Sequence, residues 1–363
     1  MKPADIRVVI MAGGTGGHIF PALAIARQLR EQGVTVTWLG TRHGMEARVV
    51  SEADFPIRYV SVSGLRGKGM AGWLMAPIKL TYAIVQVVGI YVSLRPHVVI
   101  GFGGFVTGPG GFAAWLLRKP LVVHEQNAIP GLTNRILSHM ARTVLEAFTG
   151  SFPQTTRAIH TGNPVREDIA ALTEPAVRIN QHQGPLRMLV IGGSLGAQAL
   201  NEVVPRALNL LHDRTSVSVW HQAGANKYEQ TNALYKSFAL EARVAPFIND
   251  MAEAYAWADV VICRAGALTL AELCAAGLGS ILVPFPHAVD DHQTANANYL
   301  VKAGAAILLP QTELSAEKLS ALLQEMITRG RAHIIKMAEA ARGLAMPNAS
   351  KQVAEHCLEA VHG

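Results

Sequence analysis

The chain has 363 residues, 50% of them apolar and 16% charged, which predicts about two domains and excludes a disordered chain. Its three cysteines lie far apart without a CxxC pair, which excludes a disulfide framework or a zinc ribbon and favours a reducing cytoplasm. Residues 1–163 carry 16 Lys and Arg against 7 Asp and Glu, a positive excess that suits binding to an anionic membrane or a phosphorylated substrate. Nucleic acid is not an expected partner, because the chain has no run of basic residues interspersed with aromatic ones.

The chain opens with the pattern of a strand, a glycine loop and a helix. Residues 7–11 read RVVIM, GGTGGH follows, and residues 19–32 have a helical pattern. A loop of this kind presents backbone N–H groups at the positive end of a helix to phosphate oxygens. It fails the nicotinamide fingerprint because Ile19 stands where a small residue is needed, and the chain holds no GxxxxGK[ST], which excludes a P-loop ATPase.

The rest of the first half predicts a parallel sheet, with short β-branched strands between helical stretches. We expect these strands at residues 35–39, 97–101, 121–123 and 143–145, with a second glycine loop, GFGGFVTGPGG, after the strand at 97–101. The most apolar stretch, Leu80–Leu94, is shorter than the roughly 20 residues of a spanning helix, so we expect a buried core helix, with a membrane-surface contact as the alternative.

A cluster of apolar and basic residues just before this stretch is typical of shallow contact with anionic lipid. It comprises Leu65, Met70, Trp73, Leu74 and Met75 beside Arg66, Lys68 and Lys79, and Trp115–Leu117 could extend it. The alternative is an ordinary core helix.

The second half repeats the opening pattern. A strand at 186–191, the loop GGSLGA and a helix at 198–212 precede expected strands at 216–222, 244–246, 260–263 and 280–283. The chain is therefore predicted to be α/β, with two doubly wound domains in tandem. We place the boundary in the connector HTGNPVR, giving residues 1–163 plus a returning C-terminal segment, 343–363, and residues 164–342.

Two segments of the second half carry candidate ligand groups. In RAGALTLAELCAAG, residues 266–269 could open a helix with free N–H groups, and Glu272 could accept two hydrogen bonds from a ribose diol or, three residues after Thr269, form a capping box. In PFPHAVDDHQTANAN, the spacing of His287, Asp290, Asp291 and His292 matches no closed metal site, whereas Gln293 and Asn296 suit a sugar.

Six segments in order resemble one family. They are GGTGGHIFPALAIA, GGFVTGPGGFAA, HEQNAIPGLTNRIL, TGNPVR, GGSLGAQALN and RAGALTLAEL. Over essentially its whole length the chain resembles the MurG family, bacterial transferases that add N-acetylglucosamine to the muramyl-pentapeptide lipid carrier. The resemblance implies a GT-B fold with two Rossmann-like domains facing across a cleft, UDP-N-acetylglucosamine as donor, lipid I as acceptor and lipid II as product, formed with inversion at the sugar carbon.

The resemblance also implies a set of substrate contacts. The acceptor would meet the loops 13–18 and 101–111 of the first domain, and the second domain would hold the donor. Donor contacts carried over by matching motif are Thr15, Gly16, Gly17, Asn127, Arg166, Ser194, Ile248 beside the uracil, Ala267, Leu268 and Thr269 at the diphosphate, Glu272 at the ribose, and Gln293 at the sugar hydroxyls. The loop before Gln293, residues 286–292, departs from the family pattern.

The resemblance further implies a peripheral enzyme on the cytoplasmic face of the inner membrane, with wall-synthesis proteins as possible partners. No cofactor is expected to be required, although magnesium could assist. His18 is the candidate general base for the acceptor's C4 hydroxyl, and the alternatives are a purely structural His18 and Glu125 of HEQN as the base.

Two other functions stay open at this point. A UDP-sugar epimerase or a natural-product glycosyltransferase could share the fold, although the HEQN and GGFVTGPGG segments argue against both. The second alternative is a module that binds the nucleotide sugar without turnover.

Overall fold

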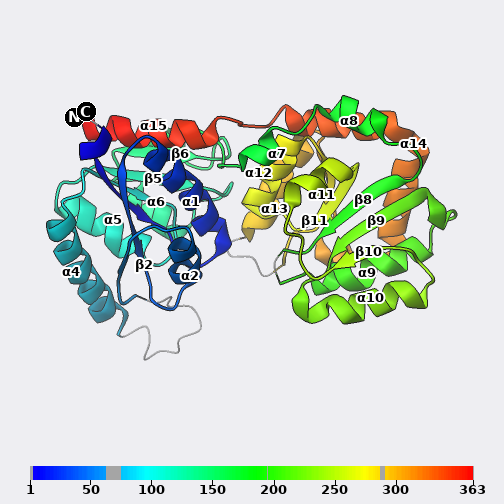
Figure 1. Ribbon diagram of the computed structural model, residues 1–363, viewed down its shortest axis with the longest axis horizontal. Coiled ribbons are helices and arrows are strands. Elements are labelled where there is room, and N and C mark those ends of the chain that lie inside the picture. Colours follow the sequence, from blue (N-terminus) through cyan, green and yellow to red (C-terminus); the bar gives the residue numbers. More distant parts are fainter. Residues whose placement is uncertain (1–2, 63–74, 194, 287–290, 363) are drawn as a thin grey trace. The chain divides into compact units, whose positions relative to one another are not determined.

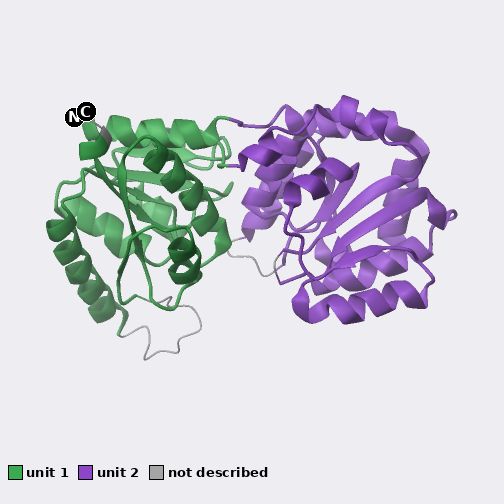
Figure 2. Cartoon of the chain, in the orientation of Figure 1, with its two compact units in different colours: residues 1–164, 348–363 green, residues 165–347 purple. Residues whose placement is uncertain are grey.

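A computed structural model describes residues 3–62, 75–193, 195–286 and 291–362 (Figure 1). The chain forms two compact units, which we call unit 1 (residues 1–164 and 348–363) and unit 2 (residues 165–347) (Figure 2). The return to unit 1 therefore begins at residue 348 and not at the expected residue 343. The reason is that Leu344 and Ala345 pack against the apolar core of unit 2.

Unit 1 contains a parallel sheet with the strand order β3-β2-β1-β4-β5-β6-β7. Its strands are β1 (Arg7–Met11), β2 (Thr35–Gly40), β3 (Ile57–Tyr59), β4 (Val98–Gly101), β5 (Leu121–Glu125), β6 (Thr143–Glu146) and β7 (Ile159–His160). The sequence did not predict β3 or β7, the short strands at the two edges. β7 even includes His160 of the expected connector.

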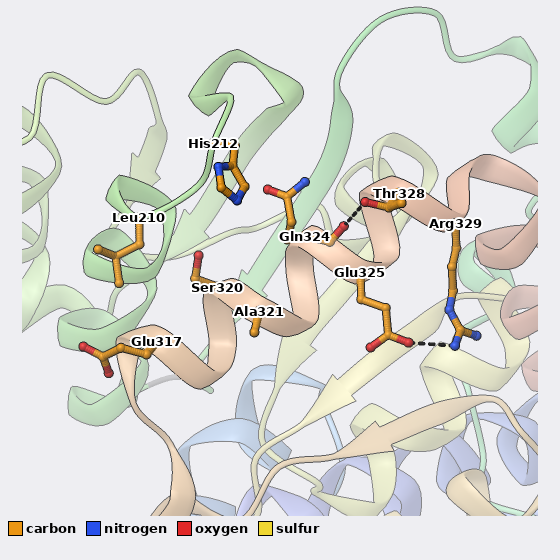
Figure 3. A pocket seen from close by; sticks show the side chains of 9 residues that line it. All are labelled: Leu210, His212, Glu317, Ser320, Ala321, Gln324, Glu325, Thr328 and Arg329. Carbon is orange, nitrogen blue, oxygen red and sulfur yellow. Dashed lines mark hydrogen bonds and ion pairs between the residues drawn. The ribbon is translucent and has the colours of Figure 1, made fainter.

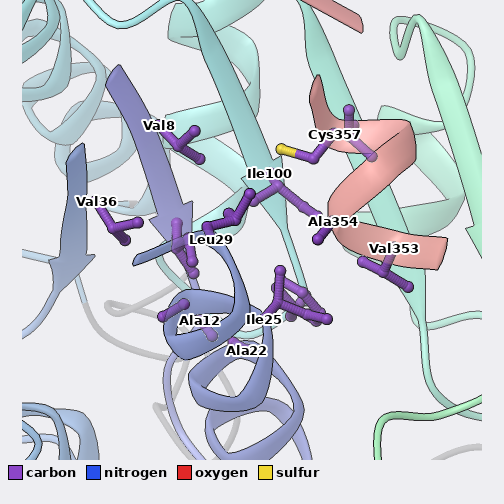
Figure 4. Packing of buried hydrophobic residues seen from close by; sticks show 14 of the residues in the cluster. Val8, Ala12, Ala22, Ile25, Leu29, Val36, Ile100, Val353, Ala354 and Cys357 are labelled. Atoms are coloured by element: carbon purple, nitrogen blue, oxygen red, sulfur yellow. The ribbon is translucent and has the colours of Figure 1, made fainter. Parts of the chain in front are cut away.

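Helices cover both faces of this sheet. They are α1 (Gly16–Glu31), α2 (Met45–Glu52), α4 (Ala76–Leu94), α5 (Thr107–Leu116), α6 (Leu132–Leu137) and α15 (Ala349–His362), with 3-10 turns at Pro3–Asp5 and Gln154–Thr156. Because successive strand residues point to opposite faces, Val8 and Ile10 of β1 pack in the cluster that contains α1 and α15 (Figure 4), whereas Val9 and Met11 pack in the cluster that contains α4 and α5.

Unit 2 contains a second parallel sheet, with the order β10-β9-β8-β11-β12-β13. Its strands are β8 (Leu186–Ile191), β9 (Val217–Gln222), β10 (Arg243–Ala245), β11 (Val260–Cys263), β12 (Gly279–Leu282) and β13 (Ala306–Leu308). Its helices are α7 (Glu167–Ala170), α8 (Pro175–Gln181), α9 (Gln198–Asn209), α10 (Tyr228–Ser237), α11 (Met251–Trp257), α12 (Ala267–Ala276), α13 (His292–Lys302) and α14 (Ala316–Arg342), with 3-10 turns at Arg214–Ser216, Ala225–Lys227 and Gln311–Glu313.

The two sheets share one topology, in which the strand order reverses beside the first strand of each unit. The reversal lies between β1 and β4 in unit 1 and between β8 and β11 in unit 2. Ligands of open α/β sheets bind outside the carboxyl ends of the strands at such a reversal. The glycine loops after β1, β4 and β8, and the start of α12 after β11, all lie at these two points.

Helix α4 differs from its prediction. It has 19 residues, and by length and apolar composition it is the one helix in the described part of the chain that could cross a membrane, which is weak evidence taken alone. The expectation of a buried core helix is wrong, because only the stripe of Ala83, Val87 and Tyr91 is buried. Large apolar residues on the rest of the helix are exposed, namely Ile78, Leu80, Tyr82, Val85 and Val92.

Candidate functional site

The two glycine loops of unit 1 pack against each other. At Gly104, where φ is +84°, a Cβ atom would lie 2.1 Å from the carbonyl oxygen of Gly13. At Gly103, where φ is +102°, a Cβ atom would lie 3.0 Å from the ring of His18. Glycine is therefore needed in the second loop both for its backbone conformation and for the close approach of the first loop. This contact brings His18 to the reversal point of the sheet.

A buried carboxylate, that of Glu46, fixes the first glycine loop by accepting a hydrogen bond from one of its amides. Glu46 of α2 is fully buried, and it accepts hydrogen bonds from the Thr41 amide at 2.9 Å, the Thr41 hydroxyl at 2.7 Å and the Gly14 amide at 3.3 Å. Because Gly14 donates internally, the amides of Gly16 and Gly17, in the first turn of α1, are the better candidates for binding an anion. Sequence reasoning missed Glu46, since no motif marks a buried carboxylate on α2 as the acceptor for the loops after β1 and β2.

Glu125 is a second buried carboxylate and is only 1% exposed. Its Oε1 accepts from the Asn127 amide at 2.9 Å and the Asn127 side chain at 3.1 Å. Its Oε2 accepts from the Gly131 amide at 3.1 Å and the Asn134 side chain at 2.9 Å. Four donors saturate this carboxylate, so the structure argues against Glu125 as the base and gives it the role of orienting Asn127.

His18 is partly exposed, and its Nδ1 lies 2.9 Å from Oε1 of Gln126. The predicted contacts Thr15, Gly16 and Gly17 are its neighbours, with Thr15 as the N-cap of α1. Asn127 follows β5 in the same unit. The structure thus brings His18 and the HEQN segment together, although 108 residues separate His18 from Gln126 and no motif joins them.

In unit 2, the start of α12 is open to an anion. Gly266 is its N-cap, and no side chain of the described residues caps the helix, so the amides of Ala267, Leu268 and Thr269 keep the orphan donors of a first turn. Arg264 ties the neighbouring loops together by donating to the carbonyl oxygens of Val283 at 3.0 Å and Pro284 at 3.2 Å.

Glu272 lies one turn into α12, and the capping-box alternative for it is wrong. Thr269 is inside the helix and Gly266 occupies the N-cap. Instead Glu272 Oε2 accepts from the Tyr255 hydroxyl at 2.9 Å, and Oε1 lies 4.0 Å from Nε of Arg166. Burial raises the pKa of the Glu272 carboxyl above its ordinary value, while Tyr255 and Arg166 oppose that shift. Sequence reasoning missed Tyr255, which stands on α11, the preceding helix.

The remaining predicted contacts of unit 2 differ in their burial and in their hydrogen bonds. Gln293 accepts from the Phe285 amide at 2.8 Å, which fixes its side-chain oxygen toward that loop. The side chain of Ile248 is buried, and its neighbour Phe247 is 53% exposed. The expectation that Asn296 meets a sugar is wrong, because Asn296 is fully buried and donates to the Ala265 carbonyl at 3.3 Å.

Some predicted residues cannot be placed. Ser194, His287 and Asp290 lie outside the described residues. Within the described ranges, no group of three or more His, Cys, Asp or Glu side chains could hold a metal ion.

A pocket of about 740 Å³ lies elsewhere in unit 2, between the segment after α9 and one side of α14 (Figure 3). Its lining includes Leu210, His212, and the ion pair of Glu325 with Arg329 at 2.7 Å. None of the predicted site residues lines it.

Comparison with known proteins adds a family to this geometry. Residues 8–146 match the glycosyltransferase family 28 N-terminal domain and residues 187–353 match its C-terminal domain. The chain is 55% identical over 358 residues to a UDP-N-acetylglucosamine--N-acetylmuramyl-(pentapeptide) pyrophosphoryl-undecaprenol N-acetylglucosamine transferase of Nitrosococcus oceani, covering 99% of both chains. It is 54% identical to the transferase of the same name from Marinobacter nauticus, covering 98% of both.

Solved structures give the same picture. The crystal structure of Acinetobacter baumannii MurG has a TM-score of 0.87 to this chain at 42% identity, covering 98% of this chain and 99% of that one. The UDP-GlcNAc 2-epimerase of Neisseria meningitidis reaches a TM-score of 0.66 at 14% identity, covering 98% and 100%, which is a likeness of fold alone.

The saturated carboxylate of Glu125 generates a test. We expect Glu125→Gln to lower the free energy of unfolding in urea by about 2–3 kcal/mol, because the new amide group opposes donors that are already buried. Glu355→Gln on α15, which removes only a 3.9 Å exposed pair with Lys351, is the control and should change it by less than about 0.5 kcal/mol. Unchanged stability together with a large loss of kcat would restore Glu125 as a candidate base.

Proposed function

The chain belongs to the MurG transferases of glycosyltransferase family 28, and we infer from this membership that it transfers N-acetylglucosamine from UDP-N-acetylglucosamine to lipid I, forming lipid II for peptidoglycan. The observation that carries this inference is 55% identity extending over 99% of the chain to a transferase named for that reaction. The test is UDP release that depends on both UDP-N-acetylglucosamine and a lipid I analogue. A chain that bound the donor without release would instead be the binding module.

We propose that the acceptor meets unit 1 and the donor meets unit 2. In support, the positive charge of the sequence lies in residues 1–163, where a membrane-held pyrophosphate would need it. The uncapped start of α12 can accept the donor diphosphate at Ala267–Thr269, and Glu272 beside it can accept the ribose hydroxyls. The proposed reaction requires no resident cofactor, although magnesium could assist at the diphosphate.

The proposed step is a single displacement. The C4 hydroxyl oxygen of the acceptor forms a bond to the anomeric carbon from the face opposite UDP, while the bond from that carbon to the UDP oxygen breaks. The proton of the hydroxyl passes to His18, and the negative charge that develops on UDP is stabilised by the amides of α12.

The base can be tested directly. We expect His18→Ala to lower kcat by about 10²–10⁴-fold, the usual contribution of a general base, with nearly unchanged binding of UDP-N-acetylglucosamine in calorimetry. Near-normal kcat in this variant would leave His18 only a structural role in its loop.

The ribose assignment has its own test. Loss of hydrogen bonds to a charged acceptor costs about 1.5–3 kcal/mol each, so Glu272→Ala should lower kcat/KM for the donor by roughly tens- to thousands-fold. Tyr255→Phe keeps the carboxylate and is the control, with a much smaller effect. Because burial raises the pKa of Glu272, donor affinity should be present above that pKa and fall as the pH drops through it. Unchanged UDP affinity in Glu272→Ala would contradict the assignment.

We also propose peripheral attachment to the cytoplasmic face of an anionic inner membrane through α4 and its neighbour α5. In support, α4 exposes the apolar residues named above, α5 exposes Trp115 and Leu116, and the cations Lys79, Arg118 and Lys119 lie next to them in the chain. This arrangement suits shallow insertion combined with electrostatic attraction. The basic cluster of residues 65–74 falls outside the described residues.

Vesicle sedimentation tests this surface. The double variant Val85→Glu and Val92→Glu should weaken binding to anionic vesicles about tenfold or more, because it removes apolar area and adds repulsion. Val177→Glu, at a position on α8 of unit 2 that is 49% exposed, is the matched control and should bind as the wild type does. Equal binding by the wild type and the double variant would exclude α4 as the contact.

A further inference from the structure

A chain of polar contacts leads from His18 into the interior of unit 1. His18 Nδ1 lies 2.9 Å from Gln126 Oε1, and Gln126 Nε2 lies 3.0 Å from Nδ1 of His124 and 2.9 Å from the His124 carbonyl oxygen. His124 Nε2 lies 3.0 Å from the carbonyl oxygen of Gly162. His124 is fully buried and Gln126 is 1% exposed, so each of these groups depends on its protein partners.

Two backbone carbonyl oxygens, those of Gly162 and His124, determine where each proton lies along this row of hydrogen bonds. A carbonyl oxygen only accepts, so His124 must carry its proton on Nε2, facing Gly162, and its Nδ1 is an acceptor. The amide group of Gln126 must likewise turn its Nε2 toward the His124 carbonyl, because the flipped amide would place two acceptors against each other. Gln126 Oε1 then faces His18, and only a protonated Nδ1 of His18 can satisfy it.

We propose that Gln126 and His124 are positioning residues that hold His18 in the Nδ1–H tautomer and thereby leave its Nε2 as the proton acceptor in the transfer reaction. This inference rests on the proposed role of His18 as the base. Neither residue belongs to the substrate contacts that the motifs imply. Both act through His18 and need not touch a substrate.

The surroundings of the chain stabilise this single proton arrangement. Burial lowers the pKa of His124 to about 4, so the ring stays neutral at neutral pH and keeps its Nδ1 lone pair for Gln126. The side chain of Asn163 donates to the Gln126 carbonyl oxygen at 2.9 Å, which fixes the backbone at that position. On the other side, Gly103 approaches the His18 ring closely, so the imidazole is held between a glycine and an amide.

Nuclear magnetic resonance tests the tautomer without any variant. In protein labelled with ¹⁵N-histidine, the His18 ring signals, assigned by their loss in His18→Ala, should be those of the Nδ1–H form. An Nε2–H form of His18 in the wild type would overturn the proposal, whatever the activity of the enzyme.

Two variants of Gln126 then connect the tautomer to catalysis. Gln126→Leu removes the acceptor, so the Nε2–H form that free histidine favours in water should appear, and kcat should fall by about 10–100-fold with KM changed by less than about threefold. Gln126→Glu, whose protonated carboxyl can donate to His124 in place of Nε2, keeps an oxygen opposite His18 Nδ1 and should retain the Nδ1–H form and most of kcat. Rescue by glutamate separates positioning from simple packing.

A buried network in unit 2 provides the control. Tyr235→Phe removes the 2.9 Å contact to His221, another fully buried histidine, and should lower stability while leaving kcat and the His18 signals unchanged. Wild-type kcat in Gln126→Leu, alongside a large loss in His18→Ala, would overturn the role of Gln126 and leave the base in place. Wild-type kcat in His18→Ala would instead contradict the proposed base itself.

Discussion

Hydrogen bonds from loop amides to buried carboxylates organise the carboxyl edge of the unit 1 sheet. Glu46 holds the loops after β1 and β2, Glu125 holds the loop after β5, and Glu146 accepts from the amides of Gly150 at 2.8 Å and Phe152 at 3.1 Å after β6. Loops at this edge cannot pair with strands, so their buried amides need acceptors from elsewhere. Glu46 thereby holds the loop that leads to His18, and Glu125 holds Asn127 directly.

The two units use one topology for different chemistry. At the reversal in unit 1, side chains crowd the loops, and a histidine with defined hydrogen bonds results. At the reversal in unit 2, the start of α12 is left uncapped and Glu272 stands one turn inside it. An ordered imidazole suits proton transfer, whereas free amides suit a leaving diphosphate. In the proposed reaction, the same strand order would supply the base in unit 1 and the amides that stabilise the leaving group in unit 2.

Much of this could be predicted from the sequence where the signal is local. Strand, glycine loop and helix are contiguous, and every predicted strand is present within two residues of its expected bounds. What could not be predicted is long-range. The contacts of Glu46 with Gly14, of Tyr255 with Glu272 and of Gln126 with His18 each join two different elements, and no local motif predicts them. The sequence also does not distinguish a buried asparagine such as Asn296 from an exposed one. Edge strands as short as β7 give too few residues for an alternation to show. For α4, the apolar composition did not show that only one stripe of the helix is covered by the rest of unit 1.

Unit 1 cannot complete its apolar core until α15, the last helix of the chain, has been synthesised. Val353, Ala354 and Cys357 are fully buried in the cluster that also contains β1 and α1, yet the whole of unit 2 separates them in sequence from those elements. A ribosome therefore releases the strands of unit 1 long before the helix that covers them. Unit 2, by contrast, is continuous in sequence and has all its core residues once its own synthesis ends. During translation the second unit in the sequence can be the first to finish folding, and the nascent first unit exposes an apolar face until then, which is a natural place for a chaperone to act.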